Sequence, residues 1–198
     1  MINESLSFLC DELNKYLRQK LGLGPADIAV VMFNISHLAD GNNNGGNAPA
    51  ANAYLSLVNV EEDRISKQQE NYVRGTDGIR YQSPKLFLNL YVLFSVNEKT
   101  YDESLIKLSF ITQFFQYNNV FDPLTTPGLD ERIEKLIVDM CSLSFEQLNH
   151  LWGTQGGKYL PSVLYKIRQV TINENATTSE AGFIKEIHLN EKLKKAVS

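Results

Sequence analysis

Histidine and cysteine are the residues of this 198-residue chain best suited to metal binding or nucleophilic chemistry. Metal sites usually place ligands close together, at positions i and i+4 of a helix or as paired cysteines. His37, His150 and His188 each lack a second ligand at such a spacing, and His37 with Asp40 fits a chance surface pair. The sequence therefore predicts no metal site and no cofactor.

Cys141 and His150 are the residues that could act as a nucleophile and its base. Cys141 follows the largely apolar run 137–140, however, and Cys10 lies in an apolar periodic segment. A buried cysteine often behaves as a small hydrophobic residue. We therefore interpret both as reduced core thiols.

Residues 153–158 (GTQGGK) resemble a phosphate-binding loop, but the match fails in three respects. One spacer residue is missing, Tyr159 stands where such loops carry Ser or Thr, and a helix is expected before the segment. A flexible connection between a helix and a strand is the better interpretation. Because no catalytic constellation is found, we predict that the protein is not an enzyme.

The chain carries a net charge of −4 and has a pI of about 5.4. Proteins that bind duplex nucleic acid usually present a basic face, and no run of Lys and Arg precedes the last few residues. The first residues lack the features of a signal peptide, and no apolar stretch reaches the ~20 residues of a membrane helix. We expect assembly in the cytoplasm, no nucleic-acid partner and no direct membrane insertion.

Hydrophobic periodicity predicts the helices that must position these residues. Apolar residues at spacings of three and four predict a helix over 2–21, which Gly22, Gly24 and Pro25 end. A second helix is expected over 101–117. Ser144 with Gln147 forms a capping box for a short helix that runs through Trp152.

Apolar runs that are short, alternating or rich in β-branched residues predict the strands. We expect them at 28–35, 54–64, 85–96, 132–143 and 164–172, where a helix is the alternative for 132–143 only. The polar segments 36–53 and 66–84 are expected to be long loops. This order predicts an α+β fold, a mixed and largely antiparallel sheet with helices packed on it. We expect one domain over 1–172 and a C-terminal extension over 173–198.

Four segments, taken together, resemble the tail-terminator or cap proteins of extracellular contractile injection systems, the family of the antifeeding-prophage and Photorhabdus virulence cassette particles. The first two are INESLSFLCDELNKYLRQ and YLSLVNVEEDR. The third pairs PKLFLNLYVLFS with YDESLIKLSFITQFFQ, and the fourth is LSFEQLNHLWGTQGGKYLPSVLYKIRQVTI. The order and spacing of all four make the resemblance specific. It does not extend to the Asn-rich loop or to 173–198.

The resemblance implies a structural protein with a phage tail-terminator-like fold. Such proteins form a homo-hexameric ring that ends the inner tube and the sheath, fixes their length together with a ruler protein, and holds the distal sheath end during contraction. The implied partners are further copies of the chain, the sheath and inner-tube proteins, and the ruler. The particle itself would be released or anchored by other subunits.

A ring needs interfaces, and the apolar patch in the C-terminal extension is our first candidate. Phe183, Ile184 and Ile187 could add as a strand to the sheet edge of a neighbour, although the arm could equally fold back on its own domain. Further candidate interface residues are Tyr54, Arg74 and Arg80.

Two other functions fit the same sequence. A head- or tail-completion adaptor ring of a phage-like particle would share the fold and symmetry but need a second face for a portal. An oligomeric binding scaffold unrelated to injection machines is the alternative from another class. Neighbouring genes for sheath and tube proteins would distinguish these functions.

Overall fold

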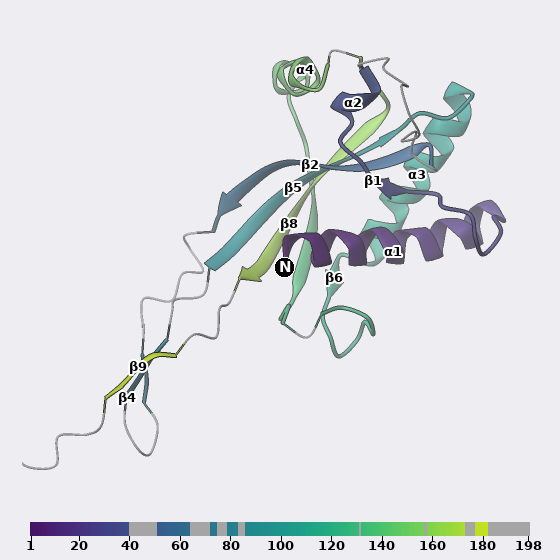
Figure 1. Ribbon diagram of the computed structural model, residues 1–198. Helices are drawn as coiled ribbons and strands as arrows, with labels where there is room; N and C mark the ends of the chain where they lie inside the picture. The colour runs from purple at the N-terminus through teal and green to yellow at the C-terminus, as the bar shows by residue number, and fades with distance from the viewer. Residues whose placement is uncertain are drawn as a thin grey trace, which may run out of the picture. The chain divides into compact units, whose positions relative to one another are not determined.

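A computed structural model gives the fold of the chain (Figure 1) and describes residues 1–39, 51–63, 72–74, 79–82, 86–130, 132–156, 158–172 and 177–181. The chain divides into two compact units, which are described separately here. The first comprises Met1–Lys67 and Leu86–Ile172, and the second comprises Gln68–Lys85 and Asn173–Ser198. The domain boundary expected after residue 172 stays a prediction.

Six strands form the main sheet of the first unit, in the order β1-β2-β5-β8-β7-β6. β1 runs parallel to β2, and every other neighbouring pair is antiparallel. The predicted α+β fold with a mixed, largely antiparallel sheet is therefore confirmed. The strands are β1 (Val31–Met32), β2 (Ala53–Glu62), β5 (Leu86–Val96), β6 (Val120–Phe121), β7 (Leu136–Cys141) and β8 (Ser162–Ile172).

β1 is much shorter than the strand predicted over 28–35. Only Val31 and Met32 pair with β2, opposite Tyr54 and Leu55. The β-branched residues of this segment are compatible with a strand, but strand pairing also requires a neighbouring backbone to receive the hydrogen bonds.

Side chains take those hydrogen bonds on either side of β1. Asn14 Oδ1 accepts the backbone N–H groups of Ala29 and Val30, each at 2.9 Å. Ser56 Oγ donates to the carbonyl oxygen of Phe33 at 2.6 Å. The backbone is thus satisfied without extending the strand, which explains why the prediction was wrong.

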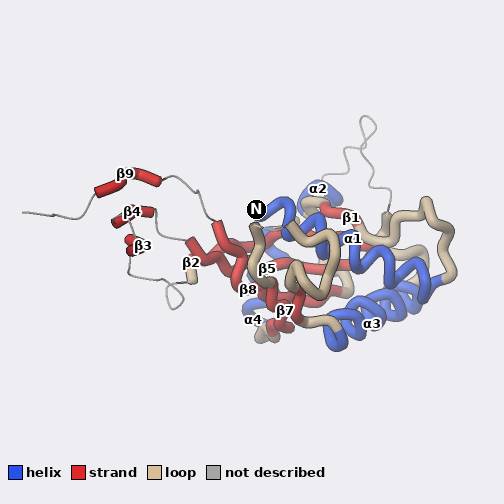
Figure 2. Tube along the Cα trace, turned by 90° about the horizontal axis from the view of Figure 1, so that it is seen from below, coloured by secondary structure: helices blue, strands red, loops and turns tan. Residues whose placement is uncertain are grey.

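The two long helices cover one face of the main sheet, where they lie side by side (Figure 2). Their bounds, α1 (Ile2–Leu21) and α3 (Tyr101–Tyr117), are those predicted from periodicity. Gly22 ends α1 with a φ of 64°, a left-handed conformation that glycine adopts without steric cost. Tyr16 of α1 and Phe114 of α3 pack together with ring centroids 5.3 Å apart.

The core between these helices and the sheet is rich in aromatic contacts. Phe115 of α3 lies 5.2 Å from Phe94 of β5 and 4.8 Å from Tyr165 of β8, measured between ring centroids. Aromatic pairs at such distances stabilise beyond the area they bury. Phe114 and Phe115 of α3 are therefore part of the core, whereas Tyr117 at the end of the helix is 83% exposed.

The opposite face of the sheet carries a smaller cluster of buried residues under α4 (Phe145–Thr154) and α2 (Ser36–Ala39). Ser144 and Gln147 cap α4 reciprocally: Gln147 N–H donates to Ser144 Oγ at 3.2 Å, and Ser144 N–H donates to Gln147 Oε1 at 2.9 Å. The predicted capping box is confirmed. The cluster consists of Ile35, Leu93, Trp152 and Leu164.

The second unit contains three short strands in the order β3-β4-β9, all antiparallel. The segment 66–84, predicted as a loop, therefore holds β3 (Tyr72–Arg74) and β4 (Ile79–Gln82). β4 pairs with β9 (Thr177–Ala181), which comes from the far end of the sequence. Pairing over such a separation leaves no local signal in the sequence, and each of these strands is short.

The segment 36–53, also predicted as a loop, begins with the four residues of α2 and ends where β2 starts at Ala53. Its middle, 40–50, lies outside the described residues. Among the helices that the structure describes, none combines the length and the apolar character needed to cross a membrane.

Candidate interaction surfaces

The residues considered for catalysis lie in different surroundings. Cys10 is buried in α1, where Sγ lies 3.4 Å from the carbonyl oxygen of Val30, and burial raises its pKa to about 11. Cys141, expected in the core, is only partly buried at the rim of the smaller cluster, because it ends the strand beside the solvent-facing start of α4. His150 is exposed on α4, and no hydrogen bond joins it to Cys141, both of which lie in the described part of the chain. His188 lies outside the described residues.

Metal-binding clusters are also missing from the described part of the chain: no group of three or more His, Cys, Asp or Glu side chains could hold an ion there.

The predicted interface residues fall mostly outside the described side chains. Phe183, Ile184 and Ile187 lie in a segment that the structure does not describe. For Arg74 and Arg80 only the backbone is described: Arg74 pairs with Ile79, and Arg80 pairs with Val73 and Glu180. These assignments stay predictions.

Tyr54 is the predicted interface residue whose side chain is described. It is 4% exposed, and its ring packs 5.6 Å from that of Phe33. Burial, together with the charge of Glu98, raises the pKa of Tyr54. Little of this side chain is available to a partner in the isolated chain.

A polar row crosses the sheet on the face that carries α4. Tyr91 of β5 donates its hydroxyl proton to Glu61 Oε2 at 2.8 Å, and Lys166 of β8 lies over the Tyr91 ring, 5.3 Å from its centroid. The hydrogen bond with Tyr91 raises the pKa of Lys166, and Glu61 adds to the effect. Arg168 binds Asp139 of β7 at 2.6 Å. These charges are paired on the sheet itself, so this row is a solvated face and not a set of poised catalytic groups.

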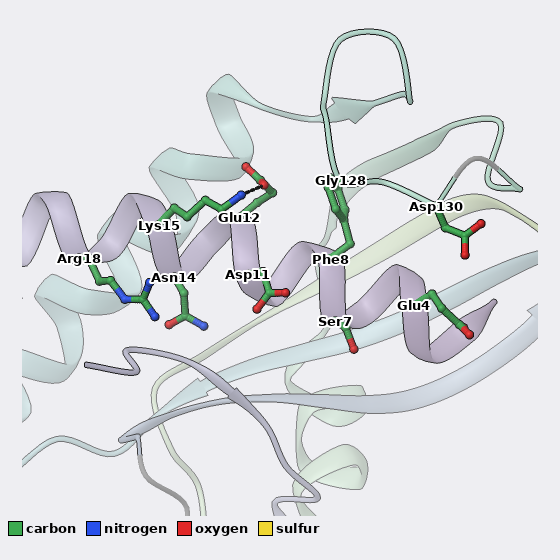
Figure 3. Close-up of a pocket in the computed structure, with 10 residues that line it drawn as sticks. All are labelled: Glu4, Ser7, Phe8, Asp11, Glu12, Asn14, Lys15, Arg18, Gly128 and Asp130. Atoms are coloured by element: carbon green, nitrogen blue, oxygen red, sulfur yellow. Dashed lines mark hydrogen bonds and ion pairs between the residues drawn. The ribbon is translucent and has the colours of Figure 1, made fainter. Parts of the chain in front are cut away.

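A cleft of about 620 Å³ lies along α1 (Figure 3). Glu4, Asp11 and Arg18 come from the helix, and Gly128 and Asp130 come from the loop after β6. Lys15 already pairs with Glu12 at 2.5 Å on the same helix. The lining carries both charge signs, so the cleft shows no preference for a ligand of one charge.

Exposed apolar residues gather at one edge of the main sheet, which we call the β2 edge patch: Met32, Leu57 and Val60. Their side chains are 37%, 40% and 41% exposed. Leu57 and Val60 pair with Val92 and Leu90, whose side chains lie in the core under α1 and α3. The patch is therefore the edge of the core face that the helices leave uncovered.

At the opposite edge, Met140 lies on the core face beside Tyr165, whereas Val120 lies on the α4 face opposite Ile137. Together with Leu124 of the loop after β6, they form a second exposed group, the β7 edge patch: Val120, Leu124 and Met140. Their side chains are 39%, 95% and 54% exposed. Periodicity alone could not separate these residues from the core, because an apolar residue at the rim of a sheet follows the same alternation as a buried one.

Helix α3 turns apolar side chains outward along its first turns. Leu105 and Ile106 are 40% and 51% exposed, whereas Ser104 and Lys107 face inward and are 4% and 9% exposed. Lys107 is stabilised inside by an ion pair with Glu98. An ordinary surface helix shows the reverse pattern, so this outer side of α3 is a third apolar surface.

Two solved structures share this fold. The first is the sheath/tube terminator of an extracellular contractile injection system, PVC, in the extended state. It matches with a TM-score of 0.59 and 12% identity over 100% of this chain and 65% of that one. The second, the tube-terminating cap of the anti-feeding prophage, matches with a TM-score of 0.53 and 14% identity over 90% and 58%.

These matches confirm the predicted tail-terminator-like fold. The chain spans less than two thirds of the length of either solved protein. No curated protein sequence matches it. The sequence profile of the Pvc16 N-terminal domain matches residues 7–186, which is most of the chain. The chain belongs to the Pvc16 N-terminal domain family.

Proposed function

We propose that this protein is a non-enzymatic cap that ends the inner tube and the sheath of a phage-tail-like contractile injection particle. One observation carries the proposal: the family profile and the fold of a sheath/tube terminator both extend over nearly the whole chain. The cap is a ring of six copies that holds the distal sheath end and, with a ruler protein, sets the length of the tube.

Apolar surfaces on the first unit support an assembly role. A protein that works as a monomer rarely leaves several groups of large apolar side chains exposed. Here such groups occur at both edges of the main sheet and on the outer side of α3. A stable contact buries about 800 Å² on each partner, so a ring that also binds tube and sheath needs several such surfaces.

The C-terminal segment supplies the grip on a neighbour or on the sheath. Phe183, Ile184 and Ile187 follow β9, whose backbone is tied to β4. A chain truncated after Ala181 keeps β9 and removes residues 182–198, which contain this apolar patch. Loss of sheath attachment by that variant supports the grip, whereas attachment at the wild-type level contradicts it.

The assembly itself is tested by light scattering of the purified chain, alone and mixed with sheath–tube particles. We expect a mass six times the 22.4 kDa of the chain, or six copies bound at one end of each particle. A monomer that ignores the particles contradicts the cap. Binding to a portal ring in place of the sheath–tube end would identify the adaptor instead.

Particle assembly without the protein provides the functional test. Tubes and sheaths of uncontrolled length, seen by electron microscopy, are expected when the cap is omitted. Restoration of a uniform length by the added chain would complete the test, and uniform particles in its absence would contradict the role in termination.

A further inference from the structure

We propose that the β2 edge patch of one copy docks on the β7 edge patch of the next copy, so that the main sheets meet edge to edge around the ring. The proposal rests on the proposed ring. A closed ring of identical chains needs a heterologous contact, in which two different surfaces of each chain meet. The two patches are such a pair, because they lie on one chain and at opposite edges of one sheet.

Among the described residues, the backbone is open along part of both edges. β1 covers β2 only at Tyr54 and Leu55, and β6 covers β7 only at Leu136 and Ile137. An uncovered strand edge presents N–H and C=O groups that another chain can pair with. Beyond the short edge strands, the neighbour therefore finds both apolar side chains and backbone groups.

Hydrogen bonds within the chain already occupy part of each edge. A bulge interrupts β2 between Leu57 and Asn59, and the Asn59 side chain accepts the N–H of Val60 at 2.9 Å. On β7, Val138 N–H donates to the carbonyl oxygen of Asn119 at 2.8 Å. These bonds protect part of each edge, so side-chain packing and not a long strand ladder must provide most of the contact.

Leu57 and Met140 lie at the same level of the sheet. The register joins Leu57 to Val92, Val92 to Tyr165, and Tyr165 to Met140, which places all four in one row across β2, β5, β8 and β7. Val92 and Tyr165 belong to the core under α1 and α3, so Leu57 and Met140 are exposed on that same face. If the ring axis is parallel to the strands, this row lies at the same height in every copy. Leu57 of one copy would then meet Met140 of the next.

A hollow of about 180 Å³ lies beside Met140. Phe115, Val138 and Tyr165 line it together with Met140, and Thr112, Gln116, Asn119 and Asp139 add polar groups to the lining. The hollow leaves room beside Met140 for a side chain of the neighbour, and Leu57 is the exposed apolar residue of the matching row.

Charge favours the same alignment. Glu62 ends β2 and is exposed, and the exposed Lys135 immediately precedes β7. Since β7 is antiparallel to β8 and β8 has the direction of β2, the end of β2 is level with the start of β7. An acidic group of one copy would therefore lie near a basic group of the next, which disfavours slipped alignments.

Two variants, Leu57→Asp and Met140→Asp, test the contact by light scattering. Each variant alone is expected to be monomeric, because the introduced carboxylate disrupts one of the two patches in every copy. Mixed in equal amounts, the two are expected to form a one-to-one dimer that cannot grow, since each pair has a single intact contact. Circular dichroism and thermal melting establish that both variants fold.

Leu105→Asp is the matched control, because Leu105 is as exposed as Leu57 but lies on the outer side of α3. It should remain hexameric. A hexameric wild type whose Leu57→Asp and Met140→Asp variants also form hexamers would overturn the contact and leave the cap standing. A wild type that stays monomeric, alone and on particles, would overturn both.

Discussion

Asn14 of α1 binds both backbone groups of Val30: its Nδ2 donates to the Val30 carbonyl oxygen at 2.8 Å, and its Oδ1 accepts the Val30 N–H at 2.9 Å. The same Oδ1 accepts the N–H of Ala29. A buried side chain on a helix thus replaces a strand neighbour and fixes the segment that leads into β1. Asn14 is 6% exposed, so these hydrogen bonds are largely shielded from water.

Replacing Asn14 with Ala should therefore destabilise the first unit strongly. The change leaves buried backbone groups unpaired, and each such group costs about 1–3 kcal/mol. We expect a loss of roughly 2–4 kcal/mol in the free energy of unfolding, measured by urea denaturation. Asn34→Ala is the control, since Asn34 is exposed and its side chain bonds to the nearby Ser36. Equal stability of the two variants would contradict the bracing role of Asn14.

The bracing by Asn14 also shows why the sequence predicted some elements and not others. The limits of α1, α3 and α4 follow from signals within or next to each segment, such as apolar spacing, the glycine after Leu21 and the capping box of α4. The length of β1 depends on a partner fifteen residues away in α1, and Asn14 looks like any polar residue of a helix.

The candidate surfaces were predictable only in part. The resemblance of four segments pointed to the family, which the sequence profile shows, and to the tail-terminator-like fold, which the solved structures share. Which apolar residues stay exposed depends on how far α1 and α3 extend over the sheet. The sequence of β2 gives Leu55, which is buried, and Leu57, which is exposed, the same hydrophobic character. Only the packing distinguishes them.

The inward-facing Lys107 should be essential to the stability of α3. Its ammonium group is paired with Glu98, and Asn52 Nδ2 donates to the other Glu98 oxygen at 2.8 Å. Removal of one partner from a buried pair leaves an uncompensated charge and costs about 3–5 kcal/mol. We expect Glu98→Ala to lower the free energy of unfolding by about 3 kcal/mol, because both groups keep some exposure.

The Lys15–Glu12 pair on α1 provides the control for this measurement. Lys15 is 64% exposed, and a surface pair contributes about 0–1 kcal/mol. Glu12→Ala should therefore unfold within about 1 kcal/mol of the wild type. Similar losses in the two variants would show that the Lys107–Glu98 pair is no more important than a surface pair.

The same ion pair predicts a dependence of stability on pH. Burial raises the pKa of Glu98, but the hydrogen bonds from Lys107 and Asn52 outweigh it and place the pKa below the ordinary value of 4.5. A carboxylate whose pKa is lowered on folding stabilises the protein above its unfolded pKa. That contribution is lost as the pH falls through the folded pKa.

Urea unfolding at a series of pH values between 7 and 3 tests this dependence. The wild type should lose stability more steeply below about pH 4.5 than Glu98→Gln, which cannot titrate at this position. Identical slopes in the two proteins would show that Glu98 titrates alike in the folded and unfolded states.

Cys10 and Cys141 should react with thiol reagents at very different rates. The reactive species is the thiolate, and burial raises the pKa of Cys10 from 9.0 to about 11. At pH 8 this shift alone lowers the thiolate fraction about 100-fold, and limited access slows the reaction further.

Labelling of the native Cys141→Ser protein with Ellman's reagent should therefore be slow, whereas the Cys10→Ala protein should react through the partly exposed Cys141. Denaturation in urea should make both variants equally reactive. Fast labelling of Cys10 in the native protein would mean that α1 opens from the sheet, which the packing of Leu9 and Leu13 against the core argues against.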